Sequence, residues 1–246
     1  MNTTVVDRAV GAARVPSGVP GLDELIGGGF PFHRTVLLSG DIGTGKTTFG
    51  LQFLMEGATR GEAGVLVSVD ENPRHVLEDA RRFGWDVDGA PDRRLVTVLN
   101  ASPCFTALRG RNGLDARHVA SDLTEQIRRV KASRLVIDGA TSLVPDGAPV
   151  GAVEDFVRSL IASLEDNLGC TTVLTARTSA STHTSPAGPT AERLTSGVIE
   201  LKLGPLGGRV GRSLLVRKMR GAPMTLFGER PFDIVDGRGL VLRELD

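Results

Sequence analysis

Short apolar runs alternate with amphipathic stretches along most of this 246-residue chain. The apolar runs are bounded by turn residues, which predicts buried strands at 35–40, 64–70, 94–101, 134–144 and 170–176. Between them, apolar positions with helical spacing predict helices at 45–61, 72–86, 115–132 and 153–169. Strands that alternate with helices in this way are typical of a parallel sheet.

The C-terminal part of the chain carries a different pattern. Segments 197–221 and 231–242 are rich in strand-forming residues and contain glycine turns, so we expect antiparallel hairpins there. The whole pattern predicts an α/β fold in which a mostly parallel, twisted sheet has helices on both faces and hairpins at one edge. In such a fold, ligands bind at the carboxyl ends of the strands. We expect one domain over residues 14–246, preceded by a loosely held arm at 1–13.

Composition and charge argue against several classes of protein. Hydrophobic residues make up 40% of the chain and charged residues 24%, values typical of a globular domain. Lys and Arg balance Asp and Glu at 29 each, so no overall field attracts nucleic acid or an anionic membrane. Cys104 and Cys170 are far apart, which disfavours a disulfide framework or a zinc site. No apolar run has the length of a membrane helix, and we expect a cytoplasmic protein without membrane contact.

The strongest chemical signal is "GDIGTGKT" at residues 40–47, between a predicted strand and a predicted helix. It matches the P-loop pattern GxxxxGK[ST], whose glycines let several backbone N–H groups approach a phosphate. Lys46 would neutralise the β- and γ-phosphates, and Thr47 would place its hydroxyl on Mg²⁺. We therefore predict ATP and Mg²⁺ as cofactors. The residues predicted to bind the nucleotide are Gly40, Asp41, Ile42, Gly43, Thr44, Gly45, Lys46, Thr47 and Thr48.

Three carboxylates stand where predicted strands end. Asp138 is the candidate metal residue beside Thr47 and would hold Mg²⁺ through water, although a strand-end Asp is often only a turn or cap residue. Asp70 and Glu71 follow the strand after the P-loop helix, where a carboxylate could accept the proton of the attacking water. The alternative role for this pair is capping of the next helix, but Asn72 is the better candidate for the cap.

The order of these motifs resembles the KaiC-like branch of the RecA/RadA ATPase superfamily. The matching pieces are "PSGVPGLDELIGGGFPFHRTVLLSGDIGTGKTTFGLQFL", "GVLVSVDENPRHVLEDARRFGWD", "RLVIDGATSL", "LLVRKMRGAPM" and "PFDIVDGRGLVL". They cover most of residues 14–242, and the pieces outside the P-loop make the resemblance specific. It implies a RecA-like P-loop NTPase fold and a single-domain ATPase.

The resemblance also implies roles for four residues. Asp70 and Glu71 would form the acidic pair that activates water. Lys218 and Arg220 of "KMRG" would reach the γ-phosphate of ATP bound to the neighbouring subunit, as arginine fingers do. Family members form ring hexamers with ATP at each interface, so the chain is expected to form a homo-oligomeric, hexameric ring. Without the resemblance, Lys218 and Arg220 indicate only a solvated basic edge of a strand.

Two departures from the family pattern bear on function. Glu192 and Arg193 lie where clock proteins of the family carry a phosphoacceptor Ser-Thr pair, which disfavours autophosphorylation. Ala222, Pro223 and Met224 follow "KMRG", where relatives often carry polar or His side chains that contact the nucleotide. Fewer contacts between subunits are therefore expected at the nucleotide.

Three functions compete. The one we favour is a ring ATPase whose slow turnover changes its conformation and recruits regulatory partner proteins. The second is a recombination or repair motor that binds single-stranded DNA through the Ser-, Thr- and Pro-rich stretch 177–192, which is predicted to be a mobile loop. Arg177, His183 and Arg193 are the basic residues there, but no aromatic residue offers a stacking platform for bases, so support is weak. The third is a nucleotide-gated scaffold that hardly hydrolyses ATP.

Overall fold

The computed structural model describes residues 13–87, 95–101, 121–144 without 122, 123 and 126, 148–178, 186–206, 209–223 and 228–243. The strands are β1 (Arg14–Val15), β2 (Phe30–Pro31), β3 (Thr35–Gly40), β4 (Gly64–Ser68), β5 (Val96–Asn100), β6 (Arg134–Asp138), β7 (Thr171–Ala176), β8 (Gly197–Leu206), β9 (Arg209–Met219), β10 (Glu229–Val235) and β11 (Gly239–Leu242). The helices are α1 (Leu22–Leu25), α2 (Lys46–Thr59), α3 (Pro73–Arg82), the 3₁₀ turn η1 (Ala140–Leu143), α6 (Val150–Asn167) and α7 (Ala187–Leu194). Within the helix predicted at 115–132, residues 127–130 are helical. The predicted arm at 1–13 lies outside the described residues apart from Ala13.

The main sheet has the strand order β11-β10-β9-β8-β3-β7-β6-β4-β5. Strands β8, β3, β7, β6, β4 and β5 run parallel, and β9, β10 and β11 continue from β8 as antiparallel hairpins. The α/β fold, the mostly parallel sheet and the C-terminal hairpins are therefore confirmed. The parallel register brings the carboxyl ends of β3, β7, β6 and β4 to one edge of the sheet, where Ser39 lies opposite Ala176 and Ser68 opposite Asp138.

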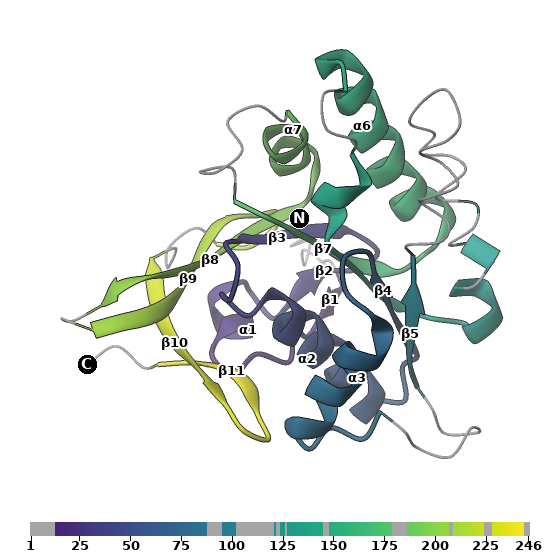
Figure 1. The fold of residues 1–246 in the computed structure, drawn as a ribbon. Coiled ribbons are helices and arrows are strands. Elements are labelled where there is room, and N and C mark those ends of the chain that lie inside the picture. The colour runs from purple at the N-terminus through teal and green to yellow at the C-terminus, as the bar shows by residue number, and fades with distance from the viewer. Residues whose placement is uncertain are drawn as a thin grey trace, which may run out of the picture.

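Helices cover both faces of the sheet (Figure 1), because successive side chains of a strand point to opposite sides. In β3, Val36 and Leu38 belong to the apolar cluster that includes Phe53 of α2. Leu37, between them, belongs to the cluster that includes Leu160 of α6. Helices α2 and α3 thus lie against one face and α6 and α7 against the other, as predicted. Among the described helices, none is both long and apolar enough to cross a membrane.

The strand predicted at 134–144 is wrong beyond Asp138, where β6 ends. Gly139 has a φ of 91°, in the left-handed region, and its N–H donates to Thr175 Oγ1 at 2.9 Å. The chain then leaves the sheet and forms η1, from which Leu143 packs into the core on the α6 face. A short apolar run is compatible with a buried turn as well as with a buried strand, so periodicity alone could not distinguish the two.

The mobile loop predicted at 177–192 is wrong in its last part, because residues 187–194 form helix α7. Residues 179–185 lie outside the described part of the chain. Ala187 and Ala191 of α7 are buried in the same cluster as α6. Lys218 Nζ donates to three carbonyl oxygens at the end of this helix, at distances from 2.6 to 3.1 Å, and a cation stabilises that end of a helix. Two alanines are too weak an apolar signal to predict such a helix locally.

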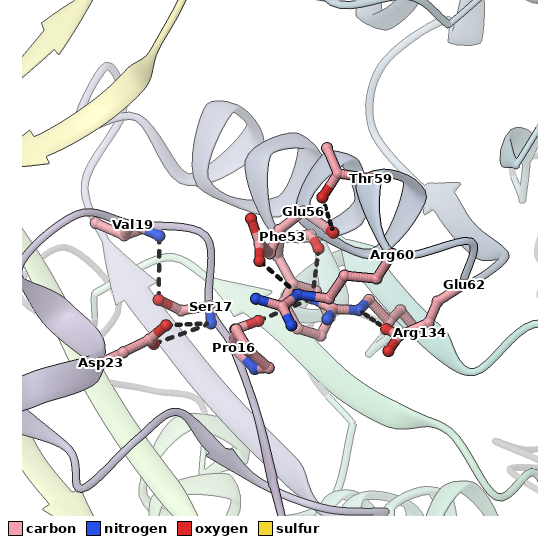
Figure 2. A network of polar contacts seen from close by, with 10 residues as sticks. All are labelled: Pro16, Ser17, Val19, Asp23, Phe53, Glu56, Thr59, Arg60, Glu62 and Arg134. Carbon is pink, nitrogen blue, oxygen red and sulfur yellow. Dashed lines mark hydrogen bonds and ion pairs between the residues drawn. The ribbon is translucent and has the colours of Figure 1, made fainter.

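A buried arginine fastens α2 to the sheet and to the N-terminal segment (Figure 2). Arg134, at the start of β6, has a side chain that is 0% exposed. Its Nε donates to Glu62 Oε2 at 2.7 Å, and its Nη1 donates to the carbonyl oxygens of Pro16 and Phe53 at 2.8 Å each. Gly57 makes room for it, because a Cβ there would lie 2.5 Å from Arg134 Cδ. Arg134 therefore fixes the C-terminal half of α2, the helix that follows the P-loop.

Candidate functional site

The loop between β3 and α2 has a backbone conformation that requires glycine at two positions. Gly43 and Gly45 have φ values of 78° and 104°, in a region that side chains rarely adopt. A Cβ at Gly45 would lie 2.9 Å from Ile234 Cδ1 of β10, so a larger residue would also be crowded. Thr44 Oγ1 donates to the carbonyl oxygen of Asp41 at 2.9 Å, within the loop. Helix α2 begins directly after the loop, so its N-terminus faces any anion bound there.

Lys46 lies over this loop. Its Nζ donates to the carbonyl oxygens of Gly40 and Asp41 at 2.8 Å each. Burial lowers the pKa of Lys46, the carboxylate of Asp138 opposes this change, and the positive charge of Arg177 lowers the pKa further. A bound anion would stabilise the ammonium form, so this surrounding favours a phosphate over a neutral ligand.

Thr47 and Asp138, the two predicted metal residues, are in contact. Thr47 Oγ1 donates to Asp138 Oδ2 at 2.7 Å. Thr175 Oγ1 of β7 donates to the other oxygen, Asp138 Oδ1, at 2.5 Å. Asp138 is buried, so these two hydroxyls fix the orientation of its carboxylate. Thr175 was not predicted, because only the register of β6 against β7 brings it beside Asp138.

Asp70 and Glu71 lie just beyond β4 and face the same cavity as the P-loop, a space of about 250 Å³. Burial raises the pKa of Glu71, and the negative charges of Asp79 and Asp138 raise it further, whereas the charge of His75 lowers it. A carboxylate with a raised pKa is a better proton acceptor than an ordinary surface acid. Glu71 therefore has the surroundings of a base.

Asn72 caps α3, as predicted. Its side-chain oxygen Oδ1 accepts a hydrogen bond from Arg74 N at 3.0 Å, and Pro73 begins the helix. The acid pair is therefore not needed for the cap. Ser68 Oγ donates to the carbonyl oxygen of Glu71 at 2.7 Å, which holds the turn that carries the two acids.

The cavity brings together half of the predicted site residues. Those that line it are Ile42, Gly43, Lys46, Thr47, Asp70, Glu71 and Asp138. Gly40, Asp41, Thr44, Gly45 and Thr48 belong to the same loop or to the first turn of α2. The lining residues that the sequence did not assign to the site are Gly139, Thr141, Thr175, Ala176 and Arg177.

Lys218 and Arg220 lie away from this cavity. Strand β9 runs antiparallel to β8, so its end returns to the edge where the parallel strands begin. There Arg220 N donates to the carbonyl oxygen of Ser196, and Ser196 N donates to that of Thr35, at 2.8 Å each. Thr35 is the first residue of β3, whereas Gly40, where the P-loop starts, is its last. The two cations are thus one strand length away from the P-loop of their own chain.

Two further side chains hold the P-loop and were missed by the sequence reasoning. Thr178, after β7, donates from Oγ1 to Asp41 Oδ1 at 3.0 Å. Arg212 of β9 donates from Nε and Nη2 to the carbonyl oxygen of Gly43, at 3.2 Å each. No local motif marks either residue, since each acts across the sheet rather than along the chain.

The residues present fit Mg²⁺ bound together with nucleotide phosphates. Among the described residues, no group of three or more His, Cys, Asp or Glu side chains could hold a metal ion by itself. Mg²⁺ usually takes one or two protein oxygens and completes its shell with water and phosphate. The hydroxyl of Thr47 and the carboxylate of Asp138, in contact beside Lys46, supply that donor set.

The chain is similar to known proteins along nearly its whole length. A family model described as "ATPase: KaiC" matches residues 15–246. A UPF0273 protein of Pyrococcus horikoshii is 35% identical over 242 residues and is covered to 93%, as is this chain. A UPF0273 protein of Thermotoga maritima is also 35% identical over 242 residues, which cover 93% of this chain and 95% of the relative. The crystal structure of a KaiC-like protein from Pyrococcus horikoshii matches with a TM-score of 0.79 and 32% identity, over 95% of this chain and 100% of the other.

Proposed function

The chain belongs to the KaiC family of ATPases, and from that premise we propose that it binds Mg-ATP in the cavity beside the P-loop and hydrolyses it slowly. One observation carries the proposal. Lys46, Thr47 and Asp138 converge on one cavity with Glu71, a carboxyl group whose pKa is raised by burial. A phosphate-binding cation, a metal-binding oxygen pair and a base are the parts that hydrolysis of a phosphoanhydride requires.

The residues of the site divide the work of phosphoryl transfer. The P-loop backbone and the N-terminus of α2 bind the phosphates, and Lys46 exchanges its two loop carbonyl partners for phosphate oxygens. Thr47 and Asp138 would hold Mg²⁺, which when bound would neutralise charge on the phosphoryl group that is transferred to water. Thr175 keeps the carboxylate of Asp138 in place. Glu71, with Asp70 beside it, orients a water molecule and accepts its proton.

A ring completes the site in this proposal. Lys218 and Arg220 lie one strand length from the P-loop of their own chain, so they can serve only the ATP of a neighbouring copy. A head-to-tail arrangement that closes on itself gives every P-loop such a neighbour, and six copies are the expected number. Hydrolysis then depends on assembly, and its product state changes the contacts between subunits. That change is what regulatory partner proteins would read.

The test is turnover of ATP by the full chain in the presence of Mg²⁺, beside a Lys46→Ala variant. We expect slow release of phosphate by the wild type and at least a hundredfold less by the variant, the order of effect that loss of a positioned catalytic group produces. Equal turnover by the two proteins would contradict the proposal. Single-stranded DNA added at several salt concentrations decides the competing function: stimulation that falls steeply with salt would favour a DNA motor instead.

A further inference from the structure

Arg177 is the one cation that lines the cavity besides Lys46, among the described residues. It directly follows β7, two residues after Thr175, which holds the carboxylate of Asp138. The sequence places it at the start of a Ser- and Thr-rich stretch, where it counts only as a basic residue for DNA. In the fold it stands at the carboxyl edge of the sheet, with Lys46 and Glu71 around the same space.

The backbone around Arg177 is fastened on two sides. Arg177 N donates to Thr141 Oγ1 of η1, at 3.5 Å. The next residue, Thr178, donates from its N–H to the carbonyl oxygen of Gly40 at 3.4 Å and from its Oγ1 to Asp41 Oδ1 at 3.0 Å. The segment is therefore tied both to the P-loop and to the turn that follows Asp138. The backbone of Arg177 therefore has a defined position relative to phosphates bound in the loop.

The charge of Arg177 is not neutralised by an ion pair within the described part of the chain. Its side chain is exposed. It lies close enough to Lys46 for its charge to lower the pKa of that residue. The acidic groups that line the cavity are Asp70, Glu71 and Asp138, and the last already accepts hydrogen bonds from two hydroxyls. The positive charges of Lys46 and Arg177 repel each other in this cavity. A polyanion bound between them would attract both charges and offset that repulsion.

We propose that Arg177 binds the terminal phosphate of the ATP held by its own subunit. This inference rests on the proposed function and deepens it. The P-loop cradles the inner phosphates, whereas Arg177 lies with Asp138 and Glu71 at neighbouring strand ends, where the transferring phosphate meets water. A planar guanidinium suits the oxygens of that phosphate. The site thus carries a cation for the third phosphate in each subunit, and Lys218 and Arg220 of the neighbour add to it.

This role also gives ATP and ADP different effects on the fold. Only a triphosphate reaches Arg177, whereas both nucleotides fill the P-loop. Thr178, the next residue, donates to Asp41 Oδ1 of the P-loop. Loss of the third phosphate therefore acts on the same short segment that contacts the P-loop.

The experiment compares the affinities of the full chain for a non-hydrolysable ATP analogue and for ADP, both with Mg²⁺, by calorimetry. The variants are Arg177→Gln and Arg177→Lys, and Arg158→Gln on the exposed face of α6 is the matched control for charge. We expect Arg177→Gln to weaken binding of the analogue about tenfold to a hundredfold, the usual value of a hydrogen bond to a charged group, and to leave ADP binding within about twofold. Arg177→Lys should restore part of the loss, and Arg158→Gln should change neither affinity.

The outcomes separate this proposal from the function on which it rests. If the wild type binds both nucleotides and Arg177→Gln leaves the ratio of their affinities unchanged, the role of Arg177 is wrong and the ATP site stands. An equal loss of both affinities would likewise overturn it, because that result indicates a general effect on the P-loop. If the wild type binds neither nucleotide, both proposals fall. Single-stranded DNA binding that is lost in Arg177→Gln while the affinity ratio stays constant would return the residue to the DNA role.

Discussion

Glu71 has surroundings whose effect on its protonation a pH profile can detect. Burial and the charges of Asp79 and Asp138 raise the pKa of Glu71. A base acts in its deprotonated form, so turnover should fall as the pH drops through this raised pKa, at a higher pH than for an ordinary Glu near 4.3. The profile of kcat/KM against pH in the wild type gives the position of this acid limb.

The matched variants are Glu71→Gln and Asp70→Asn. Glu71→Gln should lower kcat about a hundredfold and remove the acid limb, because the proton acceptor is gone. Asp70→Asn should keep the limb, with a smaller loss of rate. Undiminished turnover in Glu71→Gln would show that the base lies elsewhere.

Two arginines with the same ion-pair geometry should differ greatly in their effect on stability. Arg134 Nε and Arg60 Nε each lie 2.7 Å from a Glu oxygen, and both pairs appear in Figure 2. The Arg134 side chain is 0% exposed, whereas that of Arg60 is 50% exposed. Loss of the Arg134 guanidinium removes its hydrogen bonds to the carbonyl oxygens of Pro16 and Phe53. We expect Arg134→Leu to lower the free energy of unfolding by about 3 kcal/mol.

Arg60→Leu is the control for that change. A surface ion pair contributes little, because water already solvates both charges, so no measurable loss of stability is expected. Urea unfolding of the two variants beside the wild type supplies the comparison. Similar losses in both would contradict the interpretation of Arg134 as a buried clamp.

Among the elements, Gly57 of α2 and Gly151 of α6 are both helical, and substitution by Ala should change stability with opposite sign at the two positions. Ala is normally a better helix former than Gly. At Gly57 of α2, however, a Cβ would lie 2.5 Å from Cδ and Nε of Arg134, a side chain held by three hydrogen bonds. Gly57→Ala should therefore lower the free energy of unfolding by about 1–3 kcal/mol.

Gly151 of α6 offers the matched substitution. Apart from its chain neighbours and the backbone of its own helix, no atom lies within 4 Å of the position that a Cβ would take there. Gly151→Ala should raise the free energy of unfolding by about 0.5 kcal/mol, because it reduces the freedom of the unfolded chain without new contacts. Chemical denaturation measures both, and a stabilised Gly57→Ala variant would show that Arg134 can move aside.

Helix α7 illustrates how an element can depend on partners that are distant in sequence. Its C-terminal carbonyl oxygens, those of Glu192, Arg193 and Thr195, accept hydrogen bonds from Lys218. Lys218 belongs to β9, and only the long antiparallel pairing of β8 with β9 brings it to this place. The Ser- and Thr-rich composition predicts a mobile loop through residue 192, but at 187–194 tertiary contacts outweigh that local tendency.

For the whole molecule, the position of Arg220 predicts that two inactive proteins can restore activity together. Lys46→Ala lacks a working P-loop but keeps Arg220, whereas Arg220→Ala keeps its P-loop. In mixed rings, an intact loop meets an intact arginine at some interfaces. Equal amounts that mix at random should regain about a quarter of wild-type turnover, since half of the loops and half of the arginines are intact.

The control for this experiment mixes Lys46→Ala with Glu71→Gln. Both changes affect the same side of the interface, so no combination of subunits gives a complete site and no activity should return. Mass measurement with and without Mg-ATP shows whether rings form under the assay conditions. Mixtures of Lys46→Ala and Arg220→Ala that stay inactive although rings form would contradict the role of Arg220 across the interface.

Much of the fold and several residues beside the cavity could be predicted from the sequence alone. The P-loop from Gly40 to Thr47, the strand-end acid Asp138 and the alternation of strands and helices all depend on the spacing of residues close together in the chain. Local spacing predicts these elements because turns, strands and helices impose short periods on apolar and glycine positions. The cap at Asn72 was likewise predictable, since a cap acts on its own helix.

Contacts between strands could not be read in this way. Four contacts depend on which strands become neighbours and in what register. They are those of Thr175 with Asp138, of Arg212 with Gly43, of Arg177 with the cavity and of Lys218 with α7. Parallel strands are joined by long crossovers whose sequence does not specify the order of strands in the sheet. Local spacing therefore predicted site residues that do lie beside one cavity, whereas the neighbours that other strands bring to them could be found only from the strand order and register.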